Sequence, residues 1–105
     1  SIKKSDIQPA SANAITVLSR AKIQLTINLN NIRIQGADLS NGIFNNSQFV
    51  RADLNNVNFQ NAKLQSANLK GASLQSANLN GANLNGANLR DSNLQDAKCS
   101  NDLSL

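Results

Sequence analysis

The residues that could do chemistry are few in this chain, and their types favour binding over catalysis. The sequence has no His, Tyr, Trp or Met, so the commonest general base is missing. Its single cysteine, Cys99, has no histidine to activate the thiol and no second cysteine for an internal disulfide. Phosphate loops, dinucleotide fingerprints, zinc spacings and calcium-binding repeats are absent from the sequence. We therefore predict a protein that is not an enzyme, with no catalytic residues, no cofactor and no metal site.

Three cations, Arg51, Lys70 and Arg90, form the candidate partner-binding surface. The five-residue repeat described below predicts that residues 20 apart stack in neighbouring coils. Lys70 then lies directly beneath Arg90, and Arg51 lies in the adjacent column one coil lower. Residues 27–101 carry six cations and four aspartates, a net charge of +2, while the whole chain carries +4. Asp91 adjoins Arg90, no outward aromatic offers a stacking platform, and three phosphate contacts give weak, salt-sensitive affinity. A protein partner is therefore favoured, and nucleic-acid binding through this basic stripe is the alternative.

A five-residue repeat must position these side chains. In the register that starts at Leu29, every fifth residue is apolar, and the residue two before it is small or aliphatic. The register comprises Leu29, Ile34, Leu39, Phe44, Phe49, Leu54, Phe59, Leu64, Leu69, Leu74, Leu79, Leu84, Leu89, Leu94 and Cys99. The other three positions of each unit are polar except at Ile43 and Val50, which lie near the first corners. We expect these two residues to pack under an N-terminal helix, and a docking patch is the alternative.

This period fits neither a helix nor an uninterrupted strand. Five helical steps advance about 500°, and an odd period on a strand sends alternate side chains to opposite faces. The pattern requires one corner per unit, and four corners close a coil of about 20 residues whose neighbours pair at about 4.8 Å. Gly or Asn follows two residues after the register position in ten of the fifteen units, as a type II turn favours. The exceptions, for which we expect another turn type, are Arg51, Ser66, Ser76, Asp91 and Asp96.

The units, of the form A(N/D)LXX as in ANLKGASLQSANLNGANLNGANL, resemble those of the pentapeptide-repeat family. The resemblance implies an all-β solenoid, a right-handed quadrilateral β-helix of nearly four coils over residues 27–101. It also implies a non-catalytic scaffold or protein-interaction module. Some members mimic DNA and bind type II topoisomerases through long, acidic, dimeric columns. This chain is short and basic and lacks an obvious C-terminal dimerisation helix, so that alternative is disfavoured.

The two ends carry separate expectations. Residues 1–26 are predicted to form a polar tail, an α-helical cap from Pro9 to about Arg20, and a lead-in strand. The helix would cover the first core layer, since a solenoid's terminal apolar layer must be covered; partner binding by this helix is the alternative. Residues 102–105 form a tail, and Cys99 is predicted to be a buried structural thiol. The C-terminal end is a candidate surface for oligomerisation.

The lead-in SANAITVLSRAKIQL, followed by GADLSNGIF, resembles the segment before pentapeptide runs in large multidomain cyanobacterial regulators. This resemblance, and a first residue that is Ser rather than Met, suggest a fragment or processed form of a larger protein. No run of 18 apolar residues is present, so no transmembrane helix is expected. We predict a cytoplasmic location, with the periplasm or thylakoid lumen as the alternative.

Overall fold

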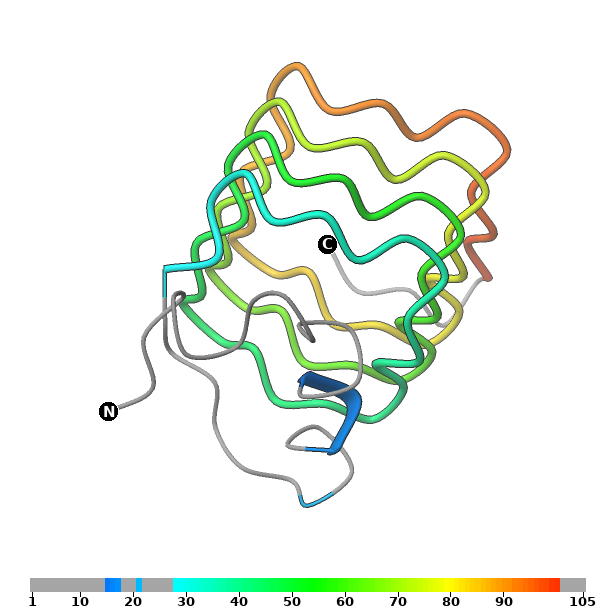
Figure 1. Ribbon diagram of the computed structural model, residues 1–105. Helices are drawn as coiled ribbons and strands as arrows, with labels where there is room; N and C mark the ends of the chain where they lie inside the picture. The colour runs from blue at the N-terminus through cyan, green and yellow to red at the C-terminus, as the bar shows by residue number, and fades with distance from the viewer. Residues whose placement is uncertain (1–14, 18–20, 22–27, 101–105) are drawn as a thin grey trace.

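A computed structural model describes residues 15–17, 21 and 28–100, and the structural statements below concern these residues. Residues 28–100 wind into a four-sided coil whose turns stack into a column (Figure 1). Eleven parallel bridges join the outward residue at the centre of each side to the residue 20 positions later, from Asn28↔Gln48 to Asn78↔Lys98. Each bridge is an isolated one-residue pairing, because a corner follows before a longer strand can form. The predicted 20-residue coil is confirmed.

All described corners are the same turn. The N–H of the residue after the corner donates to the register carbonyl three residues earlier, as Ala72 does to Leu69 at 3.0 Å. The second corner residue has a positive φ, between 56° and 73°, in all fourteen described corners. Positive φ at this position alone, with a bond spanning four residues, defines the type II turn. The expectation of another turn type at the five exceptional corners is therefore wrong: Arg51, Ser66, Ser76, Asp91 and Asp96 have φ of 56–60°.

Backbone hydrogen bonds between coils impose this uniform geometry. Around one unit, the N–H groups of Leu54 and Asn56 donate to carbonyls of the next coil at 2.7 and 2.9 Å. The N–H of Asn58 donates in the opposite direction, to Ala37 of the preceding coil at 2.9 Å. A corner with a different turn would misalign these bonds, so the stack forces even an arginine into the left-handed region.

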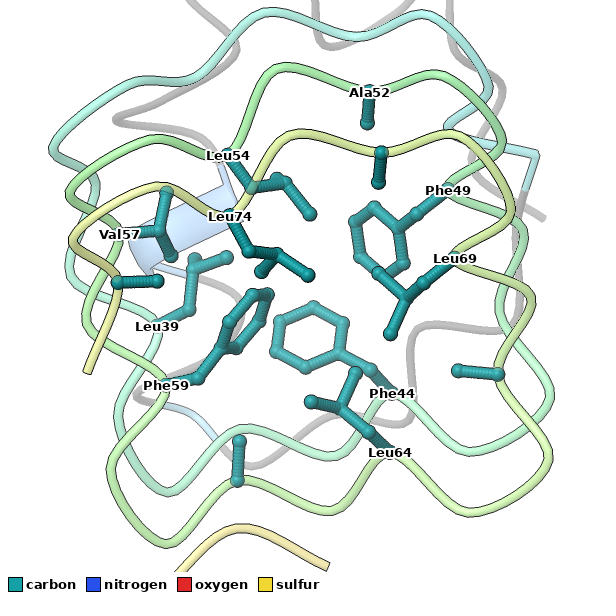
Figure 2. Close-up of a cluster of buried hydrophobic side chains, with 14 of the residues drawn as sticks. Leu39, Phe44, Phe49, Ala52, Leu54, Val57, Phe59, Leu64, Leu69 and Leu74 are labelled. Atoms are coloured by element: carbon teal, nitrogen blue, oxygen red, sulfur yellow. The ribbon is translucent and has the colours of Figure 1, made fainter. Parts of the chain in front are cut away.

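The column is filled by the register side chains and the small residues two positions before them. From Leu29 to Leu84 every register residue is at most 2% exposed, which confirms their predicted inward orientation. Figure 2 shows leucines and phenylalanines from different sides converging on the axis. Phe44, Phe49 and Phe59 form an edge-to-face triangle with ring centroids 5.8, 5.9 and 6.2 Å apart. Ile43 and Val50, the outward apolar exceptions, are half-buried.

The two ends of the column differ. At the N-terminal end, Ile15 is fully buried and belongs to the same core cluster as Leu29, while Val17 is 66% exposed. Residues 15–17 are helical, but the rest of the predicted Pro9–Arg20 helix and the lead-in strand lie outside the described residues. The covering helix therefore stays a prediction.

The C-terminal end of the described column is open. Leu89 is half-buried and Leu94 is 38% exposed, although both occupy the inward register. The predicted burial of Cys99 is wrong, because this cysteine is exposed. Its position lies in the last described coil, where no following described coil covers the register residues.

The polar residue before each register position also has a structural role. In nine units an Asn or Asp at the centre of the side accepts, through Oδ1, the N–H of the first corner residue two positions on. This Asx interaction satisfies a backbone donor that faces neither adjacent coil's carbonyls. It explains physically why A(N/D)L is the recurrent unit.

Three of the units that lack this Asn or Asp borrow an acceptor from the coil below. Where Gln48, Lys63 or Ser73 occupies the centre of the side, the N–H of the first corner residue donates to an Asn that lies 20 residues earlier, in the coil below. The three bonds are Val50 to Asn30 (2.7 Å), Gln65 to Asn45 (2.9 Å) and Gln75 to Asn55 (2.9 Å). We call these three asparagines the substitute acceptors. The column thus has two ways of satisfying the same backbone donor.

Candidate partner-binding corner

The three cations singled out by the sequence lie at one corner of the column. Among the described residues, no other Lys or Arg occupies a corner position. The remaining cations of the column, Arg33, Lys63 and Lys98, occupy side centres in three different bridge ladders. We call Arg51, Lys70 and Arg90 the basic corner. All three residues are exposed.

Backbone hydrogen bonds fix the spacing of the basic corner. The N–H of Arg51 donates to the carbonyl of Lys70 at 2.8 Å, and the N–H of Gly71 donates to the carbonyl of Arg90 at 2.9 Å. The three cations therefore come from three consecutive coils, about 4.8 Å apart, and span about 10 Å along the column. The predicted alignment of Lys70 and Arg90 with Arg51 in the adjacent column is confirmed.

Arg51 occupies a backbone conformation that suits other residues better. Its φ is +56°, a region favoured by Gly and Asn, and it is the one long side chain among the fourteen described second-corner positions. From the coil below, Asn31 Oδ1 accepts a hydrogen bond from Arg51 Nε at 3.4 Å. On the coil above, a Cβ at Gly71 would lie 3.2 Å from Arg51 Cγ, so glycine leaves room for the arginine stem.

The neighbouring backbone is held as well. Val50, which precedes Arg51, donates its N–H to the substitute acceptor Asn30 at 2.7 Å. Two asparagines of one corner therefore fix both the backbone and the guanidinium of the corner above. The corner holds the exposed Arg51 side chain by one of its five N–H donors, and the other four have no acceptor among the described residues.

The charges of the basic corner are not neutralised within the described column. Asp91 occupies the same corner, in the stack of Arg51 and Gly71, and lowers the net charge of the corner to +2, but none of the three cations forms an ion pair with a carboxylate among the described residues. Like charges on adjacent coils repel one another, so an anionic partner that neutralises them gains electrostatic energy. The arrangement can bind an anion but has no group placed for proton transfer or nucleophilic attack.

The described residues contain no other centre of chemistry. No group of three or more His, Cys, Asp or Glu lies close enough to hold a metal ion. Asp38 and Asp53 belong to different bridge ladders, so these carboxylates do not form a pair. The part of the chain that the structure describes also has no helix long and apolar enough to cross a membrane.

Sequence reasoning located the cations but missed the residues that hold them. Asn30, Asn31 and Gly71 looked like ordinary corner residues, because Asn and Gly suit every corner of this fold. A signal was available for Asn30: it lies 20 residues before the corner of a unit whose centre, Gln48, lacks an Asx acceptor. The 20-residue period is the signal for the other two, because it places Asn31 directly below Arg51 and Gly71 directly above it.

Comparison with known proteins places the column in a family. Residues 25–99 match the family described as the pentapeptide repeat region. The chain therefore belongs to the pentapeptide-repeat family, whose fold, a right-handed quadrilateral β-helix, agrees with the stacked four-sided coils. No match was found among curated protein sequences.

Several solved structures are similar to the chain. A pentapeptide repeat protein from the Arabidopsis thaliana thylakoid lumen is 27% identical with a TM-score of 0.73, covering 74% of this chain and 54% of that one. Rfr23 from the cyanobacterium Cyanothece 51142 is 34% identical with a TM-score of 0.37, covering 75% and 60%. A pentapeptide repeat protein from Nostoc PCC 7120 is 29% identical with a TM-score of 0.42, covering 90% and 81%. The chain thus spans 54% and 60% of the first two proteins.

Proposed function

We propose that this protein is a non-catalytic interaction module, a rigid scaffold that binds an acidic segment of a protein partner through the basic corner. One observation carries the proposal: every corner cation of the described column gathers at a single corner, with Arg51 held in a conformation that favours Gly or Asn. The mechanism is preorganised geometry, without turnover or cofactor.

Nucleic acid is the less favoured partner. Three phosphate contacts give weak, salt-sensitive affinity, and base stacking would need exposed aromatic side chains. Phe44, Phe49 and Phe59, the only aromatic residues of the chain, are fully buried. A DNA mimic that binds a topoisomerase needs negative charge in place of phosphates, whereas residues 27–101 carry +2.

Charge-matched variants test the proposal. The test variant Arg51→Asn/Lys70→Gln/Arg90→Gln removes the basic corner and keeps a residue at position 51 that accepts positive φ. The control variant Arg33→Gln/Lys63→Gln/Lys98→Gln removes the same charge from three exposed side centres. Fluorescence anisotropy with labelled poly-glutamate and with duplex DNA measures binding to each protein.

The expected loss is specific to the corner. Exposed ion pairs contribute about 0.2–1 kcal/mol each, so losing three weakens poly-glutamate binding by about 3- to 150-fold. The control variant should bind within about twofold of the unaltered protein, apart from long-range effects that salt screens. Equal losses in both variants would show a response to net charge alone. Tighter binding of DNA than of poly-glutamate would replace the protein partner with nucleic acid.

The C-terminal end supports a second proposed contact, self-association with another copy of the chain. The observation that favours it is the open end: Leu94 is 38% exposed, and the N–H groups of Leu89 and Leu94 have no acceptor among the described residues. In the last described coil the formal charges of Arg90 and Lys98 offset those of Asp91 and Asp96, so two identical ends carry no net charge that would repel. Concentration-dependent light scattering of the protein and of Leu94→Lys tests this contact; association unaffected by the substitution would refute it.

The compartment and the parent protein are also proposals. The cytoplasmic location stays our prediction, while similarity to a thylakoid-lumen protein supports the lumenal alternative. A place within a larger regulatory protein is likewise proposed from the lead-in resemblance. Fractionation of cells that express the chain under its natural gene context would distinguish the compartments.

A further inference from the structure

The spacing of the basic corner restricts what kind of acidic segment can use all three cations. Arg51, Lys70 and Arg90 rise by one coil each, about 4.8 Å per step and about 10 Å in total. Lys70 and Arg90 lie in one column and Arg51 in the adjacent one, so the charges form a narrow line along the column axis. A rigid partner matches this line only if its carboxylates repeat at a similar interval.

An α-helix has the matching interval. Residues three or four apart on one helix face are separated by about 4.5–6 Å along the axis, and residues seven apart by about 10.5 Å. In an extended segment, side chains on one face repeat every two residues, or about 6.6–6.8 Å, so three of them span about 13 Å. The helix agrees with the basic corner over all three positions, whereas the extended segment is out of step by about 4 Å at the third.

The column also offers an apolar contact beside the first cation. Val50 lies in the same stack as Lys70 and Arg90 and is half-buried, so part of its side chain is accessible at the level of Arg51. It is one of two apolar residues at outward positions of residues 27–101. A helix that carries an apolar side chain near its first carboxylate would cover Val50 while pairing with the cations.

We propose that the partner segment is an acidic amphipathic helix, with carboxylates at i, i+3 or i+4, and i+7, lying along the basic corner parallel to the column axis. This inference rests on the proposed function, which requires only an acidic partner. The position of Arg51 sets one end of the contact, since Asn31 holds its Nε and Gly71 accommodates its stem. The helix axis then follows the stacking direction of the coils.

Three labelled peptides of equal composition, about 20 residues long and rich in alanine, test the inference. The first carries glutamates at i, i+4 and i+7, which lie within about 60° on one helix face. The second carries them at i, i+2 and i+5, which spreads them around the helix. Each peptide also contains one proline, which is terminal in the first two. The third peptide keeps the glutamate spacing of the first but has its proline at the centre, because an internal proline breaks the helix. Circular dichroism verifies the helicity of each peptide.

The one-face peptide should bind about tenfold more tightly than the other two, and this preference should vanish in Arg51→Asn/Lys70→Gln/Arg90→Gln. It should persist in Arg33→Gln/Lys63→Gln/Lys98→Gln, which has the same net charge. Equal binding of all three peptides, or tighter binding of the proline peptide, overturns the helical partner while leaving an acidic partner in place. Absence of binding by all three and by poly-glutamate overturns both proposals.

Discussion

The substitute acceptors make a prediction that the five-residue period alone does not. Asn55 Oδ1 accepts the N–H of Gln75 at 2.9 Å and also accepts a hydrogen bond from the hydroxyl of Ser73. In Asn55→Ala, the N–H of Gln75, which lies one coil above residue 55, loses its acceptor, and the Ser73 hydroxyl must hydrogen-bond to water instead. We expect the variant to unfold more easily even though the altered side chain lies on the outside of the column.

The magnitude follows from one partly buried backbone hydrogen bond. Such a bond contributes a net of about 0.5–1.5 kcal/mol. With a urea m-value of about 1–3 kcal/mol per molar, a loss of about 1 kcal/mol lowers the unfolding midpoint by about 0.3–1 M. Far-UV circular dichroism is the suitable probe, since the chain has no Trp or Tyr.

Two further variants decide whether the hydrogen bond is the cause. Gln60 occupies the same corner position as Asn55, but the N–H above it, from Asn80, is held by Asn78 Oδ1 at 3.0 Å. Gln60→Ala should therefore change stability by less than about 0.5 kcal/mol. Ser73→Asn gives the upper unit its own acceptor and should restore most of the stability lost in Asn55→Ala. Equal effects of Asn55→Ala and Gln60→Ala, or failure of the rescue, would refute the reasoning.

Four other predictions address the core, the basic corner, the N-terminal end and the partner class. Leu74→Asn should destabilise the middle coils by more than the about 2–5 kcal/mol of a Leu→Ala change, whereas Gln75→Ala should cost under about 0.5 kcal/mol; equal urea midpoints would contradict the register. Gly71→Ala should lower stability by about 1 kcal/mol, because its φ is +68° and its Cβ would crowd Arg51; an unchanged midpoint would show that the corner relaxes freely. Deletion of residues 1–22 should cause association detectable by light scattering, and an unchanged monomer would mean that the N-terminal residues do not cover the core. The protein at micromolar concentration should neither inhibit DNA gyrase supercoiling nor shift duplex DNA tightly at low salt, and clear inhibition would overturn the charge argument.

The sequence was sufficient to predict the coil and its core. A strict period of five, with leucine and alanine two apart, leaves few geometries that bury both, and the bridges between residues 20 apart confirm the predicted one. The same period predicted that Lys70 lies beneath Arg90. Contacts between residues 20 apart can be predicted from this sequence because each coil repeats the one before it.

The errors arose where one residue's preference competes with the stack. Arg51 and Ser66 are less suited to positive φ than Gly or Asn, so another turn type was the reasonable local expectation. The bonds made by each corner to its neighbouring coils outweigh that preference and impose one turn throughout. The prediction that Cys99 is buried was wrong for the opposite reason. Cys99 occupies the inward register, but burial also requires a following coil, and a repeat pattern does not indicate what covers its last unit.

The polar coat contains more information than the period conveys. In nine units the first-corner N–H donates to the Asn or Asp of its own unit, as the N–H of Asn80 does to Asn78, and in three others it donates to an Asn one coil below. Gln60 and Lys70 lie one coil below units that have their own acceptors, Asn78 and Asn88. Asn55 lies one coil below a unit whose centre is Ser73, which has no Asx acceptor. A first-corner position that need not accept a backbone N–H from the coil above can hold a side chain of another type, such as a cation. Lys70 is such a position, because Asn88 supplies the acceptor for the N–H of Arg90 at 3.1 Å. The side chain of Lys70 is therefore not needed as an acceptor for the N–H of Arg90. Both residues can direct cationic side chains outward, which allows a line of positive charge on a column whose other outward side chains are mostly amides.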